Sequence, residues 1–161
     1  MANQPQHVDP AWAWRPFEPT AAQPGNHSRA SHLYRRARFA ANWPQLETAV
    51  KQGHAKTPDL LLPAVRKQEP VAGDKPQVAT ADALGQAMMA GTDSKRLSAW
   101  WLYRMLNTSD QTLEKITLFW HGHFATSAAK VTTSRLMLDQ NAILRRYALG
   151  KFEPMVQAIS R

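Results

Sequence analysis

The spacing of apolar residues constrains the fold of this chain most, because they recur every three or four positions from about residue 28 onward. This spacing places apolar side chains on one face of an α-helix, whereas a half-buried strand shows strict alternation. Neither strand-like alternation nor an internal repeat is present. The sequence therefore predicts an all-α fold, arranged as an irregular multi-helix bundle.

Capping and helix-ending residues divide the first part of this pattern. A short amphipathic helix is predicted from residue 28 to about residue 41. A second helix begins after the capping residue Asn42 and stops at Gly53, which can adopt a left-handed conformation. A third short helix is predicted at 57–62. Prolines and a glycine then predict a loop near residues 63–79.

The second half of the chain contains the strongest helical signals. A helix is expected through Met88-Met89, and another over 94–106 carries apolar residues around most of its circumference, so we expect it to be buried on two sides. The run Thr108-Ser109-Asp110-Gln111 matches a capping box that would start the next helix. That helix should hold Glu114 and Lys115 on its outer face and end at Gly122.

The last two predicted helices lie beyond residue 134. One ends at Gly150, and the other starts at Pro154 and reaches the last residue, Arg161. The apolar residues of this final helix have little chain left to pack on. We therefore expect the chain to be a fragment.

The first 26 residues differ from the rest because prolines punctuate them. Proline lacks a backbone donor and disfavours helix in the residue before it, so residues 1–26 should form an extended Pro/Trp-rich segment. We expect Trp12, Trp14 and Phe17 to pin this segment onto the surface of a helical domain over residues 27–161.

Twenty Lys and Arg residues against 12 Asp and Glu give the chain a net charge of +8. Such a charge attracts nucleic acid and other polyanions, but scattered basic pairs favour a solvated basic surface, with polyanion binding as an alternative. There is no cysteine, which excludes disulfides and thiolate chemistry. The chain has no recognisable signal peptide and no transmembrane segment, so we expect a soluble, cytoplasmic chain by default.

Four polar residues form a candidate site: His121, His123, Asp139 and Asn141. Histidine is the commonest metal ligand, but residues two apart on a continuous helix point about 200° apart. The two imidazoles could bind one metal only if Gly122 breaks the helix, and a third ligand is not obvious. The favoured interpretation is a helix C-terminus, where a protonated histidine complements the dipole and burial opposes protonation.

Adjacent tryptophans at 100 and 101 offer a second candidate surface, because indole rings can stack on bases or sugars. Core packing is the favoured interpretation, since the pair lies within an apolar helix.

Several runs resemble, in the same order, the bacterial family labelled "domain of unknown function 1800". They lie at residues 101–106, 113–127, 138–141, 144–146 and 148–152, and include Trp120-His121-Gly122-His123-Phe124. The resemblance implies a longer chain, because members of the family carry a second acidic, asparagine-containing helical motif downstream. This chain departs from the family pattern at Arg38 and Ala40, where glycines are expected. No activity is assigned to the family, so the resemblance implies no catalytic residue and no cofactor.

These observations predict a scaffold or partner-binding domain that acts with a missing C-terminal part or with a partner protein. One alternative is a metal-dependent or hydrolytic enzyme that uses His121 and His123 with residues missing from this chain. The other is a polyanion-binding module, for nucleic acid or another polyanion.

Overall fold

The computed structural model describes residues 10–62, 80, 83–85, 87, 94–124, 130–131 and 133–161. Helices are the only regular elements in these ranges, which confirms the all-α prediction. The predicted loop at 63–79 and the helix through Met88-Met89 lie outside the described residues. No described helix is long and apolar enough to cross a membrane.

Three helices form the first group: α1 (His27–Ala37), α2 (Trp43–Gln52) and α3 (Thr57–Leu61). The predicted cap of α2 is confirmed, because Asn42 Oδ1 accepts from the Gln45 backbone and Gln45 Oε1 accepts from the Asn42 backbone, at 3.0 and 2.9 Å. Gly53 ends this helix with a positive φ of 82°. The small shared core consists of Tyr34, Ala49 and Leu61.

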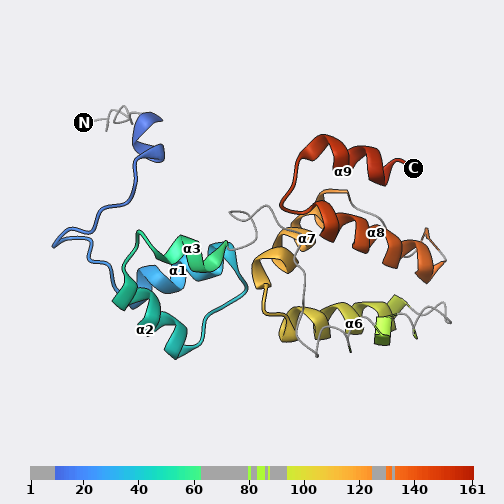
Figure 1. Ribbon diagram of the computed structural model, residues 1–161, viewed down its shortest axis with the longest axis horizontal. Coiled ribbons are helices and arrows are strands. Elements are labelled where there is room, and N and C mark those ends of the chain that lie inside the picture. The colour runs from blue at the N-terminus through green and yellow to red at the C-terminus, as the bar shows by residue number, and fades with distance from the viewer. Residues whose placement is uncertain are drawn as a thin grey trace, which may run out of the picture.

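Before α1, the described N-terminal residues form a short 3-10 helix, η1 (Pro10–Trp14), and an irregular stretch that reaches away from the helices (Figure 1). Phe17 anchors this stretch, because the Arg29 guanidinium lies 4.6 Å from its ring centroid and His54 meets it edge-on at 5.7 Å. Trp14 does not anchor the stretch, since its side chain is 88% exposed. The expected aromatic anchoring is therefore made by Phe17, while Trp14 faces solvent.

The second group comprises α6 (Ser94–Asn107), α7 (Gln111–His123), α8 (Ser134–Tyr147) and α9 (Phe152–Ile159). Helix α8 packs against both α7 and α9, and α6 contacts α7 and α8. Figure 1 shows this group beside α1–α3. Its buried apolar residues come from α6, the α8 region and α9: Trp100, Leu144, Ala148 and Met155.

Two helix-end predictions around α7 are wrong. Asp110 is the N-cap, because its carboxylate accepts from the Leu113 amide at 3.0 Å, while Thr108 Oγ1 accepts from the Asp110 amide instead. At the other end, the helix continues through Gly122 to His123. A Cβ at Gly122 would meet nothing within 4 Å, and its φ is not positive, so nothing in its surroundings makes it a stop.

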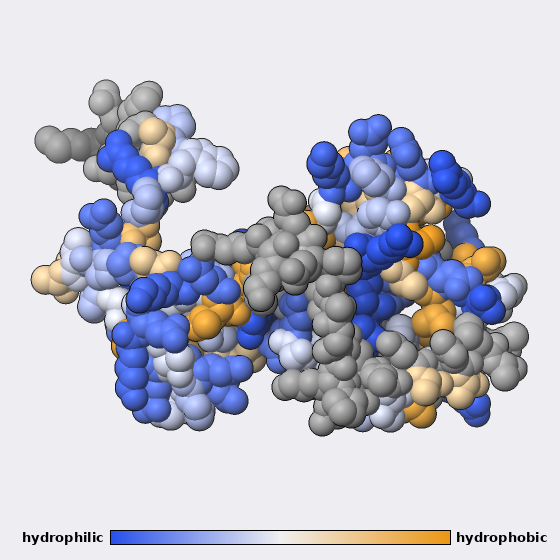
Figure 2. All heavy atoms as spheres, viewed as in Figure 1, coloured by the Kyte–Doolittle hydropathy of each residue, from blue (hydrophilic) through white to orange (hydrophobic). Residues whose placement is uncertain are grey.

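The prediction that α6 is buried on two sides is also wrong. Leu102 is 56% and Leu106 71% exposed, and Figure 2 shows hydrophobic residues reaching the surface over part of α6. The buried face of α6 includes Trp100 and Arg104. Arg145 of α8 packs against this face: its guanidinium lies over the Trp100 ring, and it binds Glu114 of α7, which also binds Arg104.

The first turns of α7 join the two groups. Thr112 Oγ1 donates to the Leu61 carbonyl at 2.6 Å, at the end of α3. Lys115 Nζ donates to the carbonyls of Arg35 and Arg38 at the end of α1, the latter at 2.7 Å. Carbonyls at a helix C-terminus have no partner within the helix, and a lysine both bonds to them and complements the dipole.

Candidate functional site

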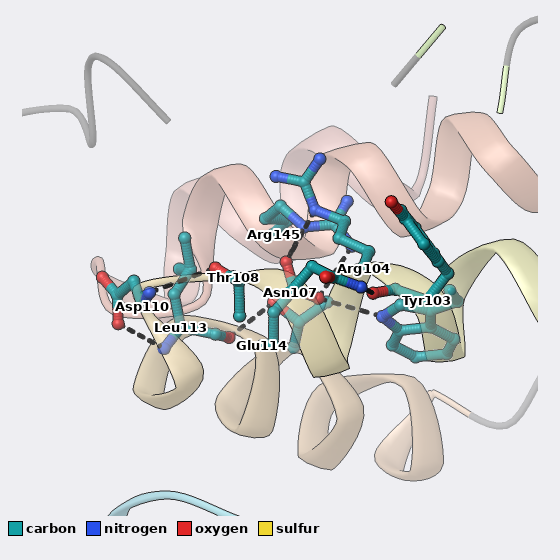
Figure 3. Close-up of polar contacts among 10 residues, drawn as sticks. Tyr103, Arg104, Asn107, Thr108, Asp110, Leu113, Glu114 and Arg145 are labelled. Atoms are coloured by element: carbon teal, nitrogen blue, oxygen red, sulfur yellow. Dashed lines mark hydrogen bonds and ion pairs between the residues drawn. The ribbon is translucent and has the colours of Figure 1, made fainter. Parts of the chain in front are cut away.

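A fully buried carboxylate, Glu114, joins three helices. Its side chain is 1% exposed and accepts from Arg104 Nε of α6 at 2.8 Å and from Arg145 of α8 through Nε and Nη2, at 2.7 and 3.0 Å. The Trp101 indole N–H adds a fourth hydrogen bond at 3.0 Å. Figure 3 shows these donors converging on the one carboxylate. We refer to these four residues as the Glu114 node.

The electrostatics of this node favour an ionised carboxylate. Burial alone would raise the pKa of Glu114, but the hydrogen bonds and positive charges of Arg145 and Arg104 outweigh it and hold the pKa below its usual value. Each carboxylate oxygen accepts two donors. A carboxylate satisfied in this way can bind the helices together but has little capacity left for a ligand.

The expectation that Glu114 faces outward is therefore wrong. Helical periodicity predicts that Glu114 lies beside Lys115 on the polar face. It is buried instead because Arg104, Arg145 and Trp101 surround its carboxylate. The local signal that could have found it is the i, i+3 spacing of Trp101 and Arg104, which puts two donors on one face of α6. Arg145 lies 31 positions away in sequence, so no local pattern indicates its contribution.

His121 lies against the Glu114 node. Its ring is 5.0 Å from the Trp101 ring and tilted by 31°. Burial lowers the pKa of His121, so the imidazole is neutral at pH 7. The direction of this shift is opposite to the one that the helix dipole alone would favour.

His123 points elsewhere, because α7 is a continuous helix and residues two apart lie on different faces. Its exposed ring packs beside Phe119 at 6.3 Å and Phe124 at 5.1 Å. The helix break that a two-histidine metal site requires is not present. Among the described residues, no three His, Asp or Glu side chains are grouped closely enough to hold a metal ion.

The two polar candidates on α8, Asp139 and Asn141, have surroundings that differ from those of the histidines. Asp139 is exposed and pairs with Arg135 one turn earlier at 3.1 Å. Asn141 is only 6% exposed, and its Oδ1 has no hydrogen-bond partner among the residues that the structure describes. The four predicted site residues thus have four environments: an indole contact, an aromatic surface, a surface ion pair and a buried amide whose oxygen has no partner in the described part of the chain.

Five rings form a contiguous surface around the C-terminal end of α7 and the start of α9, which we call the aromatic patch. Neighbouring ring centroids are 5.0 to 6.5 Å apart. Its members are Phe119, Trp120, His123, Phe124 and Phe152. The Trp120 indole N–H donates to the Ala148 carbonyl at 3.0 Å, which fixes the centre of the patch to the turn after α8.

The tryptophan pair on α6 has divided roles. Trp100 is buried, as the core-packing interpretation predicts, and the Arg145 guanidinium lies 5.7 Å from its ring centroid. Trp101 is only half-buried and serves as a hydrogen-bond donor to Glu114.

Comparison with known proteins identifies the family of this chain. A search of curated proteins and a search of solved structures each found no match. The family model described as "Protein of unknown function (DUF1800)" matches residues 32–161, which is most of the chain and includes the Glu114 node and the aromatic patch. The chain therefore belongs to the DUF1800 family.

Proposed function

We propose that this chain is a helical partner-binding unit whose contact surface is the aromatic patch. The exposure of two phenylalanines within a contiguous cluster supports this best, because Phe119 is 58% and Phe152 54% exposed. Burying apolar surface gains roughly 25 cal/mol per Å². Contiguous exposed apolar surface often marks an interaction site, and aromatic residues are enriched at the energetic centres of interfaces.

The arrangement beneath the patch supports a fixed contact surface. The Glu114 node ties α7 to α6 and α8, and Trp120 is held by the Ala148 carbonyl. A surface that is already ordered loses little conformational entropy when a partner binds. Of the four predicted polar site residues, His123 alone lies in the patch, and in this proposal it supplies a polar group among the rings.

Photo-crosslinking at the patch tests this proposal. p-Benzoylphenylalanine would replace Phe119 in one sample and Trp43 in the control, because Trp43 is similarly exposed at 60% but lies on α2. Both proteins would be irradiated in an extract of the cells that produce the chain. We expect a discrete adduct from position 119 and none from position 43.

Two further measurements show whether such an adduct uses the patch. Adding Phe152→Asp to the labelled chain should remove the adduct, because that ring lies across the patch from the probe. Excess unlabelled wild-type chain should compete, whereas an unlabelled Phe119→Asp chain should not. Equal labelling at both positions, or an adduct that survives Phe152→Asp, would overturn the proposal.

A further inference from the structure

We infer that the segment bound by the aromatic patch is an acidic, amphipathic segment of a partner protein. This inference rests on the proposed function, because it assigns the chemistry of the ligand to the same surface. It follows from the charges around the rings and from the apolar character of the rings themselves.

Two unpaired cations stand next to the patch along the chain. Lys151 directly precedes Phe152, and Arg146 lies in the last turn of α8, ahead of the turn that leads to α9. Both side chains are exposed, and neither forms an ion pair in the described part of the chain. No acidic residue occurs between Gln140 and Phe152. The Arg146 guanidinium lies 5.7 Å from the Tyr147 ring centroid, but no described carboxylate neutralises either cation, so both can pair with carboxylates on a partner.

Two other charged residues lie nearby, and one of them is neutralised. Arg145 is neutralised by Glu114. Glu153, which follows Phe152, accepts a hydrogen bond from Gln157 at 3.3 Å. Glu153 keeps its negative charge, because a neutral amide does not neutralise a carboxylate. Lys151 and Arg146 together outnumber it, so the net charge at this edge of the patch is positive, like the net charge of +8 on the whole chain.

An acidic protein segment matches this surface better than a second copy or a membrane. A second copy carries the same +8 charge and is repelled at long range. A flat anionic bilayer would meet the exposed Glu153 together with the phenylalanines. A narrow segment can contact the rings and cations while avoiding Glu153. An apolar stripe flanked by carboxylates satisfies both requirements.

A matched pair of synthetic helical peptides tests the inference. Both peptides carry the same stripe of leucine and phenylalanine, and their polar faces consist of glutamate in one and lysine in the other. Their affinities for the full chain would be measured by isothermal titration calorimetry at low and at physiological salt. We expect the glutamate peptide to bind at least tenfold more tightly, and Phe119→Ser to abolish that binding.

A matched lysine pair separates local from global charge. Lys151 is the N-cap of α9 and Lys56 the N-cap of α3, both exposed and neither with a side-chain capping bond. Lys151→Glu should reduce the preference for the glutamate peptide several-fold, whereas Lys56→Glu should leave it nearly unchanged. Equal losses in both variants would show that net charge alone attracts the peptide, and would overturn the inference.

The remaining outcomes distinguish this inference from the proposed function. If both peptides bind equally and Phe119→Ser abolishes both, the patch binds partners but the acidic specificity is wrong. If neither peptide binds, the inference is overturned, and crosslinking at position 119 still decides the proposed function independently. Sedimentation of the chain with phosphatidylglycerol vesicles but not phosphatidylcholine vesicles, lost in Phe119→Ser, would overturn the inference in favour of a lipid surface.

Discussion

Glu114 concentrates more of the buried polar contacts than any other residue we describe, because one carboxylate accepts four hydrogen bonds from two neighbouring helices. Removing it leaves the guanidinium groups of Arg104 and Arg145 facing each other inside the protein. Losing one partner of a buried ion pair typically costs about 3–5 kcal/mol. We expect Glu114→Ala to lower the free energy of unfolding by about that amount.

Urea unfolding followed by circular dichroism measures this loss. The control is Glu153→Ala, which removes an exposed carboxylate bonded only to Gln157 among the described residues and should change stability by less than about 0.5 kcal/mol. Similar effects of the two substitutions would contradict the importance assigned to the Glu114 node.

The buried Glu114 and the half-buried His121 predict how stability depends on pH. A group whose pKa is lower in the folded than in the unfolded chain binds fewer protons when folded, so acid favours unfolding. For His121, the stabilising contribution is fully present above the usual pKa of 6.5 and is lost as pH falls below it. For Glu114, the contribution is present above 4.5 and is lost as pH falls through its lowered pKa.

Melting temperatures between pH 8 and pH 3 test these two windows. His121→Phe keeps a ring against Trp101 and should flatten the decline that the wild-type chain shows below about pH 6.5. The matched His123→Phe substitution, at an exposed position, should keep the wild-type slope. Glu114→Gln should remove part of the steeper loss below pH 4.5. An unchanged profile in His121→Phe would contradict the burial of that imidazole.

The buried amide oxygen of Asn141 should lower the stability of the fold relative to an apolar side chain at the same position. This Oδ1 is buried with no partner in the described ranges, and an unsatisfied buried polar group costs about 1–3 kcal/mol. Replacing the amide by an apolar side chain of similar size should therefore stabilise the chain, and we expect Asn141→Leu to raise the free energy of unfolding by about 1 kcal/mol. Asn107→Leu is the control, because that amide donates to the Tyr103 carbonyl at 2.8 Å and its loss should bring no gain. A destabilised Asn141→Leu chain would mean that the amide is satisfied by water.

At the scale of the helix, the outer face of α6 makes the clearest prediction. Leu102 and Leu106 lie one turn apart and are both more than half exposed, so charge on that face should be tolerated. We expect the Leu102→Glu and Leu106→Glu substitutions each to change the free energy of unfolding by less than about 0.5 kcal/mol. Leu144→Ala, in the buried face of α8, should cost about 2–5 kcal/mol. Losses of that size at position 102 or 106 would show that this face is covered.

The same helix shows what the sequence can and cannot predict. Apolar spacing predicts that a helix forms over 94–106, and local capping predicts the start of α2 at Asn42, because both signals lie within a few residues. The burial of a helix face depends on which other helices pack against it, and the periodicity of one segment does not contain that information. Periodicity therefore predicts the wrong face for Glu114, and it predicts two buried sides for α6 where the structure has one.

The predicted start of α7 is wrong because two residues compete to cap the helix. Thr108 and Asp110 can both cap a helix, and the tertiary contact of Thr112 with the Leu61 carbonyl lies outside any local pattern. The histidine motif at the end of α7 lies among aromatic rings. Its importance in this structure lies in the rings around it, because Phe152 completes the patch from a different helix.

At the scale of the whole molecule, Lys115 couples the two helical groups. Its ammonium donates to the Arg35 and Arg38 carbonyls at the end of α1, while its own helix belongs to the second group. Lys115→Met keeps the aliphatic stem and removes the charge and the donors. Hydrogen bonds that involve a charged group contribute about 1.5–3 kcal/mol, and 1.4 kcal/mol corresponds to a tenfold change in an opening equilibrium.

Hydrogen exchange followed by mass spectrometry locates the effect of this substitution. In Lys115→Met, amides in the last turn of α1 should exchange roughly tenfold faster, because this end loses its attachment to α7. Amides of α8 and α9 should keep their wild-type rates, since their contacts are with the second group. The control is Lys130→Met, at an exposed position. Uniformly faster exchange along the chain would mean that the two groups unfold as one unit, and unchanged exchange would mean that Thr112 and apolar contacts hold them without Lys115.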